Sequence, residues 1–182
     1  MGRLALALAP RCRRVIGVDR QPESIAMAAR RAAATGLTNV TFVVADAEAT
    51  EYDVWSPDLV AAHLCMSDAI IARAGRALAP GHAFAFVALH ADHWSETGRP
   101  SRFAYDEAHA RTALADAGFA IEHLSVEREV TTFGSVEEAL AAVLGLEERW
   151  RVDGRWVRYI RFLEKGGRTL TRSHLIVKAR RA

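Results

Sequence analysis

The chain alternates short apolar runs with segments in which apolar residues recur every three or four positions. Such an alternation predicts strands followed by helices, and therefore an α/β fold with a mostly parallel sheet. The predicted strands cover residues 14–19, 40–46, 58–63 and 83–89, and the predicted helices cover residues 3–9, 22–35, 67–78 and 106–117. Because the apolar runs of the strands are nearly continuous, helices are expected on both faces of the sheet.

The pattern changes after residue 120. Residues 124–132 alternate apolar and polar side chains, which is typical of a half-exposed antiparallel strand, and residues 169–178 form the last predicted strand. Two helices are predicted between these strands, one opening at a capping box that starts with Ser135 and the other over residues 155–164. Residues 1–182 are therefore predicted to be a single α/β domain, with a polar loop at 90–105 and a helical insertion at 135–166.

Composition narrows the setting of this domain. The net charge of +2 gives no strong signal for a polyanion partner, and two cysteines among 182 residues do not make a disulfide scaffold. A cytoplasmic location is the simpler expectation. No apolar run reaches the length of about 20 residues that a membrane span needs. The Ala/Leu run at residues 4–9 is similar to the core of a signal peptide, but it is short, and a helix is favoured.

Two aspartates follow successive predicted strands, Asp19 after the first and Asp46 after the second. In a right-handed strand–helix–strand unit both carboxylates open onto the same edge of the sheet, where one can hold a ribose and the other a base. The alternative is that each aspartate only caps the turn or helix that follows it. These residues alone do not decide between the two interpretations.

An ordered set of motifs adds context. Residues 2–9, 15–25 and 39–47, and the Leu-Ala-Pro-Gly at 78–81 before an apolar strand, together resemble the class I S-adenosylmethionine-dependent methyltransferases, which have a Rossmann-like fold. The resemblance implies that Asp19 binds the ribose of S-adenosylmethionine.

The same resemblance assigns the other residues of the cofactor site. It implies that Asp46 and the backbone amide of Ala47 bind the adenine, and that His63 and Leu64 line the methionine moiety. Arg20 stands beside the adenine, where such enzymes usually carry an apolar residue.

One departure from the family concerns the start of the chain. Gly2 stands where the last glycine of the cofactor-binding turn belongs, so the chain is predicted to be N-terminally truncated, without the first strand and most of that turn. Either the chain is a fragment, which is favoured, or the gap is filled by rearrangement or by a partner. The chain as written is therefore expected to bind the cofactor weakly or not at all, and to be inactive if that binding is lost.

The acceptor is expected at the loop after the fourth strand. His90 or His93 is the candidate catalytic base, and Trp94 is the candidate wall of the acceptor site. The alternative is a solvated polar loop. His63, Asp92 and His93 match no strong spacing of metal ligands, so no metal is expected.

The last segment with a chemical signal is residues 149–165, which interleaves arginines with aromatic residues. It suits either RNA binding or an amphipathic helix, and the acidic residues within it favour the helix. The resemblance implies that the inserted helices cover the substrate pocket and that the acceptor is a small molecule. The alternatives are a nucleic-acid methyltransferase and a non-catalytic relative, and a homodimer is left open.

Overall fold

The structure is a computed structural model and describes residues 2–101 and 103–182. Met1, part of the predicted remnant of the cofactor turn, and Arg102, in the polar loop, lie outside the described residues. The α-helices are α1 (Arg3–Leu8), α2 (Pro22–Ala34), α3 (Asp68–Ala77), α4 (Glu107–Asp116), α5 (Val136–Val143), α6 (Glu147–Asp153) and α7 (Arg155–Glu164). The strands are β1 (Val15–Asp19), β2 (Val40–Val44), β3 (Leu59–His63), β4 (Ala83–His90), β5 (Ala104–Tyr105), β6 (Phe119–Thr132) and β7 (Thr169–Arg181). Short 3-10 helices are η1 (Ala9–Arg11), η2 (Asp53–Trp55), η3 (Ser95–Thr97) and η4 (Leu144–Leu146).

The predicted helix starts are confirmed by their caps. The side chain of Ser67 accepts the backbone N–H of Ile70 at 3.4 Å, and the side chain of Asp106 accepts that of His109 at 2.7 Å. Each cap satisfies one backbone donor that the first turn of a helix leaves unpaired. The helix bounds therefore follow local hydrogen bonds that the sequence already indicated.

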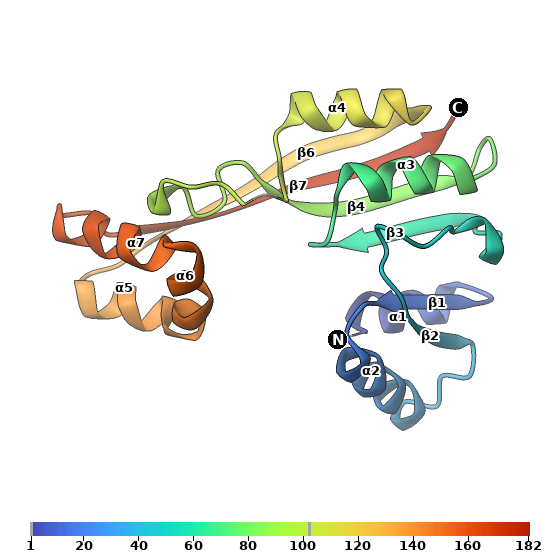
Figure 1. The fold of residues 1–182 in the computed structure, drawn as a ribbon, viewed down its shortest axis with the longest axis horizontal. Coiled ribbons are helices and arrows are strands. Elements are labelled where there is room, and N and C mark those ends of the chain that lie inside the picture. The colour runs from blue at the N-terminus through green and yellow to red at the C-terminus, as the bar shows by residue number, and fades with distance from the viewer. Residues whose placement is uncertain (1, 102) are drawn as a thin grey trace.

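The larger of two sheets has five strands in the order β3-β4-β7-β6, with β5 paired to the end of β4. Strand β4 lies parallel to β3 and antiparallel to β7, and β6 pairs with β7 along almost its whole length. In Figure 1 the β6–β7 ribbon continues well beyond β4 and carries α5, α6 and α7 near its far end. The predicted C-terminal antiparallel pair is thus confirmed, although β6 begins earlier than expected, at Phe119.

Helices α3 and α4 cover one face of this sheet. Burial alternates strictly along β4, and its buried positions pack with the inward residues of both helices and of β7. The cluster centres on fully buried side chains such as Phe84, Ile71, Leu114 and Leu175. The opposite positions of β4 are only half-buried, so this central strand is covered fully on one face.

A second apolar cluster joins the inserted helices to β7. It contains Val143, Trp150, Tyr159, Leu163 and Leu170, each at most 2% exposed. The insertion predicted at 135–166 therefore has a core of its own, and α6 is a helix that the sequence pattern did not separate from its neighbours.

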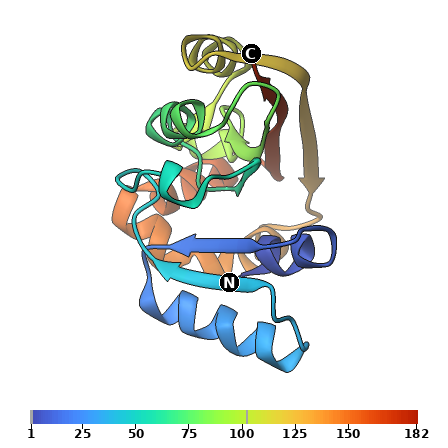
Figure 2. The ribbon, with the colours of Figure 1, turned by 90° about the vertical axis from the view of Figure 1, so that its right-hand side faces the viewer.

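The smaller sheet is a correction to the expected single sheet. Strands β1 and β2 pair in parallel and form a sheet of their own, which lies next to β3 without pairing to it (Figures 1 and 2). None of the described residues from 2 to 44 belongs to either large apolar cluster. One hydrogen bond across this boundary runs from the guanidinium of Arg14 to the carbonyl of Trp55, at 2.9 Å.

Within the described residues, no helix is long and apolar enough to span a membrane.

Candidate functional site

The two aspartates lie at the same edge of the small sheet. Strands β1 and β2 pair in register with Asp19 opposite Val44, and the N–H of Ala45 donates to the carbonyl of Asp19 at 3.0 Å. Asp46 follows directly after this bond. The pairing therefore brings both carboxylates to the carboxyl ends of adjacent parallel strands, as the sequence predicted.

Each carboxylate makes one local hydrogen bond. Oδ1 of Asp19 accepts the backbone N–H of Gln21 at 2.9 Å, and Oδ1 of Asp46 accepts that of Glu48 at 2.8 Å. Such bonds fix an aspartate in a turn without using its second oxygen. Within the described residues, Oδ2 of each aspartate has no protein partner, and both side chains are exposed. Both aspartates therefore do stabilise the turn that follows them, which was the alternative to ligand binding. This role still leaves one carboxylate oxygen of each aspartate available to accept a hydrogen bond.

The end of β3 forms the third side of this edge. His63 and Leu64 are both exposed, and Leu64 has a φ of 58°, an unusual value for an apolar residue. The N–H of Leu64 donates to the carbonyl of Val87 at 2.7 Å, which carries the pairing of β3 and β4 one residue further. This bond holds Leu64 at the sheet edge, with its side chain 42% exposed.

Asp19 and Asp46 lie close enough to Cys65 and Tyr52 to affect the pKa values of these two residues. Burial is the main cause that raises the pKa of the Cys65 thiol, and the negative charge of Asp19 raises it further. Burial likewise raises the pKa of Tyr52 to about 12, with added contributions from Asp46 and Cys65. Asp19 thus raises the pKa of Cys65, and Asp46 and Cys65 both raise the pKa of Tyr52.

The segment after Asp46 is anchored to the larger sheet. The hydroxyl of Tyr52 donates to the carbonyl of Ala47 at 2.5 Å, and Nε of Arg73 donates to the carbonyl of Glu48 at 2.6 Å. Arg73 also pairs with Glu51, and that hydrogen bond is the main cause that lowers the pKa of the Glu51 carboxyl. Ala47 is partly buried against the main cluster, so its backbone is held in place. Tyr52 and Arg73 were not singled out from the sequence.

The remaining residues of the predicted cofactor site lie on the small sheet and its helices. Gly2 has a φ of 71°, and a Cβ at this position would lie 2.6 Å from the Cβ of Ala28. This close approach of α1 to α2 requires glycine. Arg20 is exposed beside Asp19. Their assigned roles toward a cofactor stay predictions.

His90 is held by hydrogen bonds at both ring nitrogens. Its Nε2 lies 3.2 Å from Oε2 of Glu107, and its Nδ1 lies 3.1 Å from Oγ of Ser173 and accepts the N–H of Asp92 at 3.3 Å. The residue is 7% exposed. In this arrangement neither nitrogen is open to an acceptor, and the catalytic role of His90 stays a prediction.

His93 is buried as well, at 7% exposure. Its Nδ1 lies 3.1 Å from the backbone nitrogen and 3.0 Å from the carbonyl oxygen of Ser173. Burial is the main cause that lowers the pKa of His93 to about 4. A histidine with this pKa is neutral at pH 7 and takes up a proton only weakly, which makes it a poor match for a base near neutral pH.

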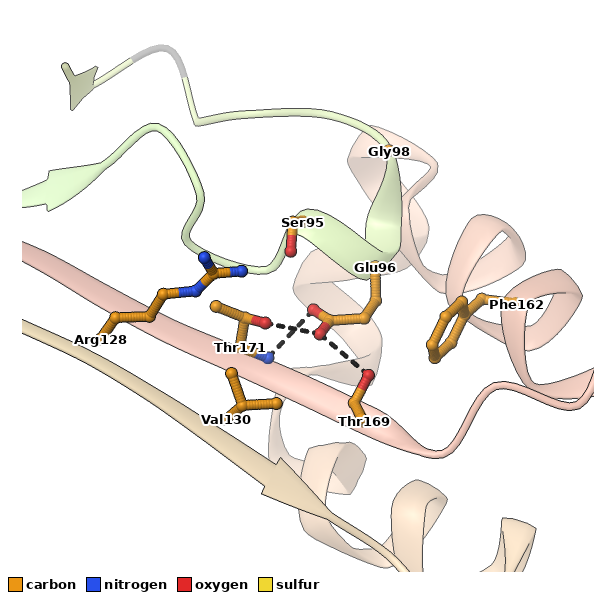
Figure 3. Close-up of a pocket in the computed structure, with 8 residues that line it drawn as sticks. All are labelled: Ser95, Glu96, Gly98, Arg128, Val130, Phe162, Thr169 and Thr171. Carbon is orange, nitrogen blue, oxygen red and sulfur yellow. Dashed lines mark hydrogen bonds between the residues drawn. The ribbon is translucent and has the colours of Figure 1, made fainter.

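Trp94 joins the loop to the insertion. It has a φ of 59° at the start of η3, and its ring contacts that of Trp150 edge-on, with 4.9 Å between the ring centroids. Beside it lies a groove of about 430 Å³. Figure 3 shows the residues that line it, which come from η3, α7 and the β6–β7 ribbon. The carboxylate of Glu96 in this groove accepts hydrogen bonds from both Thr169 and Thr171. Glu96 therefore fastens the loop to β7, and the groove includes none of the residues at the aspartate edge.

A second carboxylate–histidine contact lies where α3 and α4 begin. Nε2 of His109 lies 2.9 and 3.1 Å from the two carboxylate oxygens of Asp68, and the hydroxyl of Tyr105 donates to Asp68 at 2.7 Å. The sequence did not indicate this group, because no local spacing links residues 68 and 109. Only the pairing of β5 with β4 and the contact of α3 with α4 bring them together.

The arginine and aromatic side chains of α7 separate onto different faces. Tyr159 and Leu163 are buried in the second cluster, and Arg158 and Arg161 are exposed. Arg155 is 8% exposed and pairs with Asp153. This is the amphipathic helix favoured from the sequence.

The chain is similar in sequence to one protein family and in fold to several solved structures. Residues 1–81 match the sequence profile of a family described as methyltransferase domain. No characterised protein sequence gives a significant match to the chain.

Solved structures of low identity share the fold over nearly the whole chain. An S-adenosylmethionine-dependent methyltransferase from Mesorhizobium loti is 20% identical, with a TM-score of 0.60 over 99% of this chain and 86% of its own. The N-methyltransferase NodS from Bradyrhizobium japonicum, solved with S-adenosyl-L-homocysteine, is 16% identical, with a TM-score of 0.56 over 99% of this chain and 72% of its own. The 4+2 cyclase SpnF is 22% identical, with a TM-score of 0.65 over 99% of this chain and 70% of its own. These structures confirm the Rossmann-like fold, and one of them is named for a different reaction.

Proposed function

We propose that the chain, whose residues 1–81 match a family described as methyltransferase domain and whose fold is Rossmann-like, transfers a methyl group from S-adenosylmethionine to a small-molecule acceptor. The observation that carries this proposal is the pair of exposed carboxylates, Asp19 and Asp46, at the ends of adjacent parallel strands. Within the described residues each keeps one oxygen without a protein partner, and such an oxygen can accept a hydrogen bond from a ribose hydroxyl or from the adenine amino group.

The residues present at this edge fit the cofactor. Asp19 would hold the ribose, Asp46 and the amide of Ala47 would hold the adenine, and His63 and Leu64 would line the methionine end. Tyr52 and Arg73 support this arrangement, because their bonds to the backbone after Asp46 limit its movement.

When bound, S-adenosylmethionine supplies a methyl group on a sulfonium, and the electron pair of the broken carbon–sulfur bond stays with the sulfur. The residues of the chain position the acceptor and exclude water, which account for much of the catalysis in a displacement of this kind.

We further propose that residues 1–182 alone bind the cofactor weakly. Asp19 and Asp46 belong to the small sheet, whereas His63 and Leu64 belong to the large one, and the two sheets share neither a strand pairing nor an apolar cluster. Binding must therefore order the two halves relative to each other, and this ordering reduces affinity.

Calorimetry with S-adenosyl-L-homocysteine tests both parts. The expected dissociation constant of the unaltered chain lies above the micromolar range. Asp19→Ala or Asp46→Ala is expected to weaken binding by about 10-fold or more, since a hydrogen bond to a charged group contributes roughly 1.5–3 kcal/mol. Asp53→Ala is the matched control and should leave binding unchanged, because Asp53 is exposed and, within the described residues, its carboxylate accepts only the N–H of Val54.

Two outcomes contradict the proposal separately. Micromolar binding by the unaltered chain overturns the weak-binding part and leaves the function in place. Binding that neither Asp19→Ala nor Asp46→Ala alters overturns the assignment of the site.

A further inference from the structure

The contact between Asp68 and His109 has the geometry of a base and its orienting group. Resting on methyl transfer as proposed above, we propose that His109 is the general base for a hydroxyl-bearing acceptor and that Asp68 fixes its reactive tautomer. Both oxygens of Asp68 lie within hydrogen-bond distance of Nε2, at 2.9 and 3.1 Å. Because a carboxylate only accepts hydrogen bonds, Nε2 carries the proton, and the lone pair of the neutral ring is on Nδ1.

The other ring nitrogen of His109, Nδ1, is not engaged by the protein in the part of the chain that the structure describes. Within the described residues it has no hydrogen-bond partner, and the side chain of His109 is 53% exposed. In this respect His109 differs from His90, whose nitrogens are both engaged, and from His93, which is buried. A base must reach the proton it removes, and His109 meets this requirement.

The buried residue Tyr105 holds the Asp68–His109 pair in place. An isolated exposed ion pair contributes little order. Here the hydroxyl of Tyr105, a residue only 4% exposed, donates to Oδ1 of Asp68 at 2.7 Å, and its ring meets the His109 ring edge-on at 4.9 Å. Burial favours a higher pKa of Asp68, but the hydrogen bonds from Tyr105 and His109 outweigh it and lower the pKa. The carboxylate is thus kept ionised and in place.

Asp68, Tyr105 and His109 also lie at the carboxyl ends of strands β3 and β4. Tyr105 pairs with His90 at the end of β4, and α3 and α4 both begin here. Burial is the main cause that raises the pKa of Tyr105, followed by Asp68, and the charge of Glu48 adds to it. Nε of Arg73, on the helix α3 that begins at Asp68, donates to the carbonyl of Glu48, two residues after Asp46. Helix α3 therefore connects the Asp68–His109 pair to the segment of the proposed adenosine site.

The proton step balances within the proposed reaction. The O–H bond of the acceptor breaks, its proton passes to Nδ1 of His109, and the electron pair stays on the oxygen that bonds to the methyl carbon. Asp68 stabilises the imidazolium that results and does not itself take the proton. An acceptor that reacts through a hydroxyl needs this base, because its neutral oxygen is a weak nucleophile.

Nitrogen-15 NMR of the histidine rings tests the orientation in the 182-residue chain without any cofactor. At a pH where the ring is neutral, His109 should show the tautomer protonated on Nε2, and Asp68→Ala should shift it toward a mixture. Glu107→Ala, which removes the partner of His90 instead, should leave the His109 signals unchanged. A His109 protonated on Nδ1, or one insensitive to Asp68→Ala, overturns the proposal.

Turnover tests the base itself, with catechol, glucose and N-methylglycine as acceptor probes and mass spectrometry to detect the added methyl group. His109→Ala should lower kcat for a hydroxyl probe by about 10²- to 10⁴-fold with a smaller change in KM, and added imidazole should restore part of the loss. His123→Ala, on an exposed part of β6, is the control and should match the unaltered chain.

The outcomes separate the two proposals. If His109→Ala methylates a hydroxyl probe as fast as the unaltered chain, or if only the amine is methylated, the base assignment is wrong and the methyltransferase function stands. If the unaltered chain methylates no probe at a cofactor concentration that calorimetry shows to be saturating, the proposed function fails, and the role of His109 fails with it.

Discussion

Acidification is expected to destabilise this fold through His93. The folded chain lowers the pKa of His93 from 6.5 to about 4, mainly through burial, with the charges of His174, Arg172 and Arg155 acting in the same direction. The unfolded chain therefore binds more protons than the folded one between these values, and stability falls as the pH drops below 6.5 toward 4. Between pH 7 and pH 5, His93 alone should reduce the free energy of unfolding by about 2 kcal/mol, at 1.36 kcal/mol per pKa unit.

Urea unfolding followed by circular dichroism at both pH values measures this loss. His93→Gln keeps a hydrogen-bonding side chain but cannot titrate, so it should lose about 2 kcal/mol less than the unaltered chain over the same interval. His123→Gln, at an exposed histidine, should retain the dependence of the unaltered chain. Equal pH dependence of His93→Gln and the unaltered chain would refute the reasoning.

Two further predictions concern packing. Gly17→Ala places a Cβ 2.7 Å from Cδ1 of Phe42 and should cost about 1–3 kcal/mol of stability, whereas Gly145→Ala, with no atom within 4 Å, should cost less than about 0.5 kcal/mol in the same thermal unfolding assay. Trp150→Phe should change stability by less than about 1 kcal/mol, because the lost ring contacts are offset by removal of a buried indole N–H that has no partner. A loss above 3 kcal/mol in chemical denaturation would contradict this.

Local signals account for the parts of the fold that the sequence predicted well. Ser67 and Asp106 mark helix starts because their side chains bond to backbone only three residues away. Asp19 and Asp46 were predictable as a pair because parallel pairing of β1 and β2 is enough to bring them together. Each of these inferences needs only short-range geometry or one strand–helix–strand unit.

The parts that were missed depend on contacts between distant segments. Strand β5 has two residues, too few to show an alternating pattern, and it exists because β4 offers it a pairing edge. The contact of Asp68 with His109 requires that strand together with the packing of α4 on α3. The sequence predicted His90 as a candidate base in a loop. Its ring instead contacts Glu107 of α4 and Ser173 of β7, two residues distant in the sequence. The spacing of these residues in the sequence does not predict such contacts.

The separation of the β1–β2 sheet from the larger sheet implies that a nucleoside bound as proposed would also stabilise the fold. A molecule that contacts both Asp19 and Leu64 would connect two sheets that, within the described residues, are linked by the polypeptide loop after β2 and by the hydrogen bond from Arg14 to Trp55. We therefore expect the ligand-free chain to unfold in two steps, with the β1–β2 sheet separating first. If the cofactor binds as proposed, saturation should merge the two steps into one, because the ligand would stabilise the contact between the two sheets.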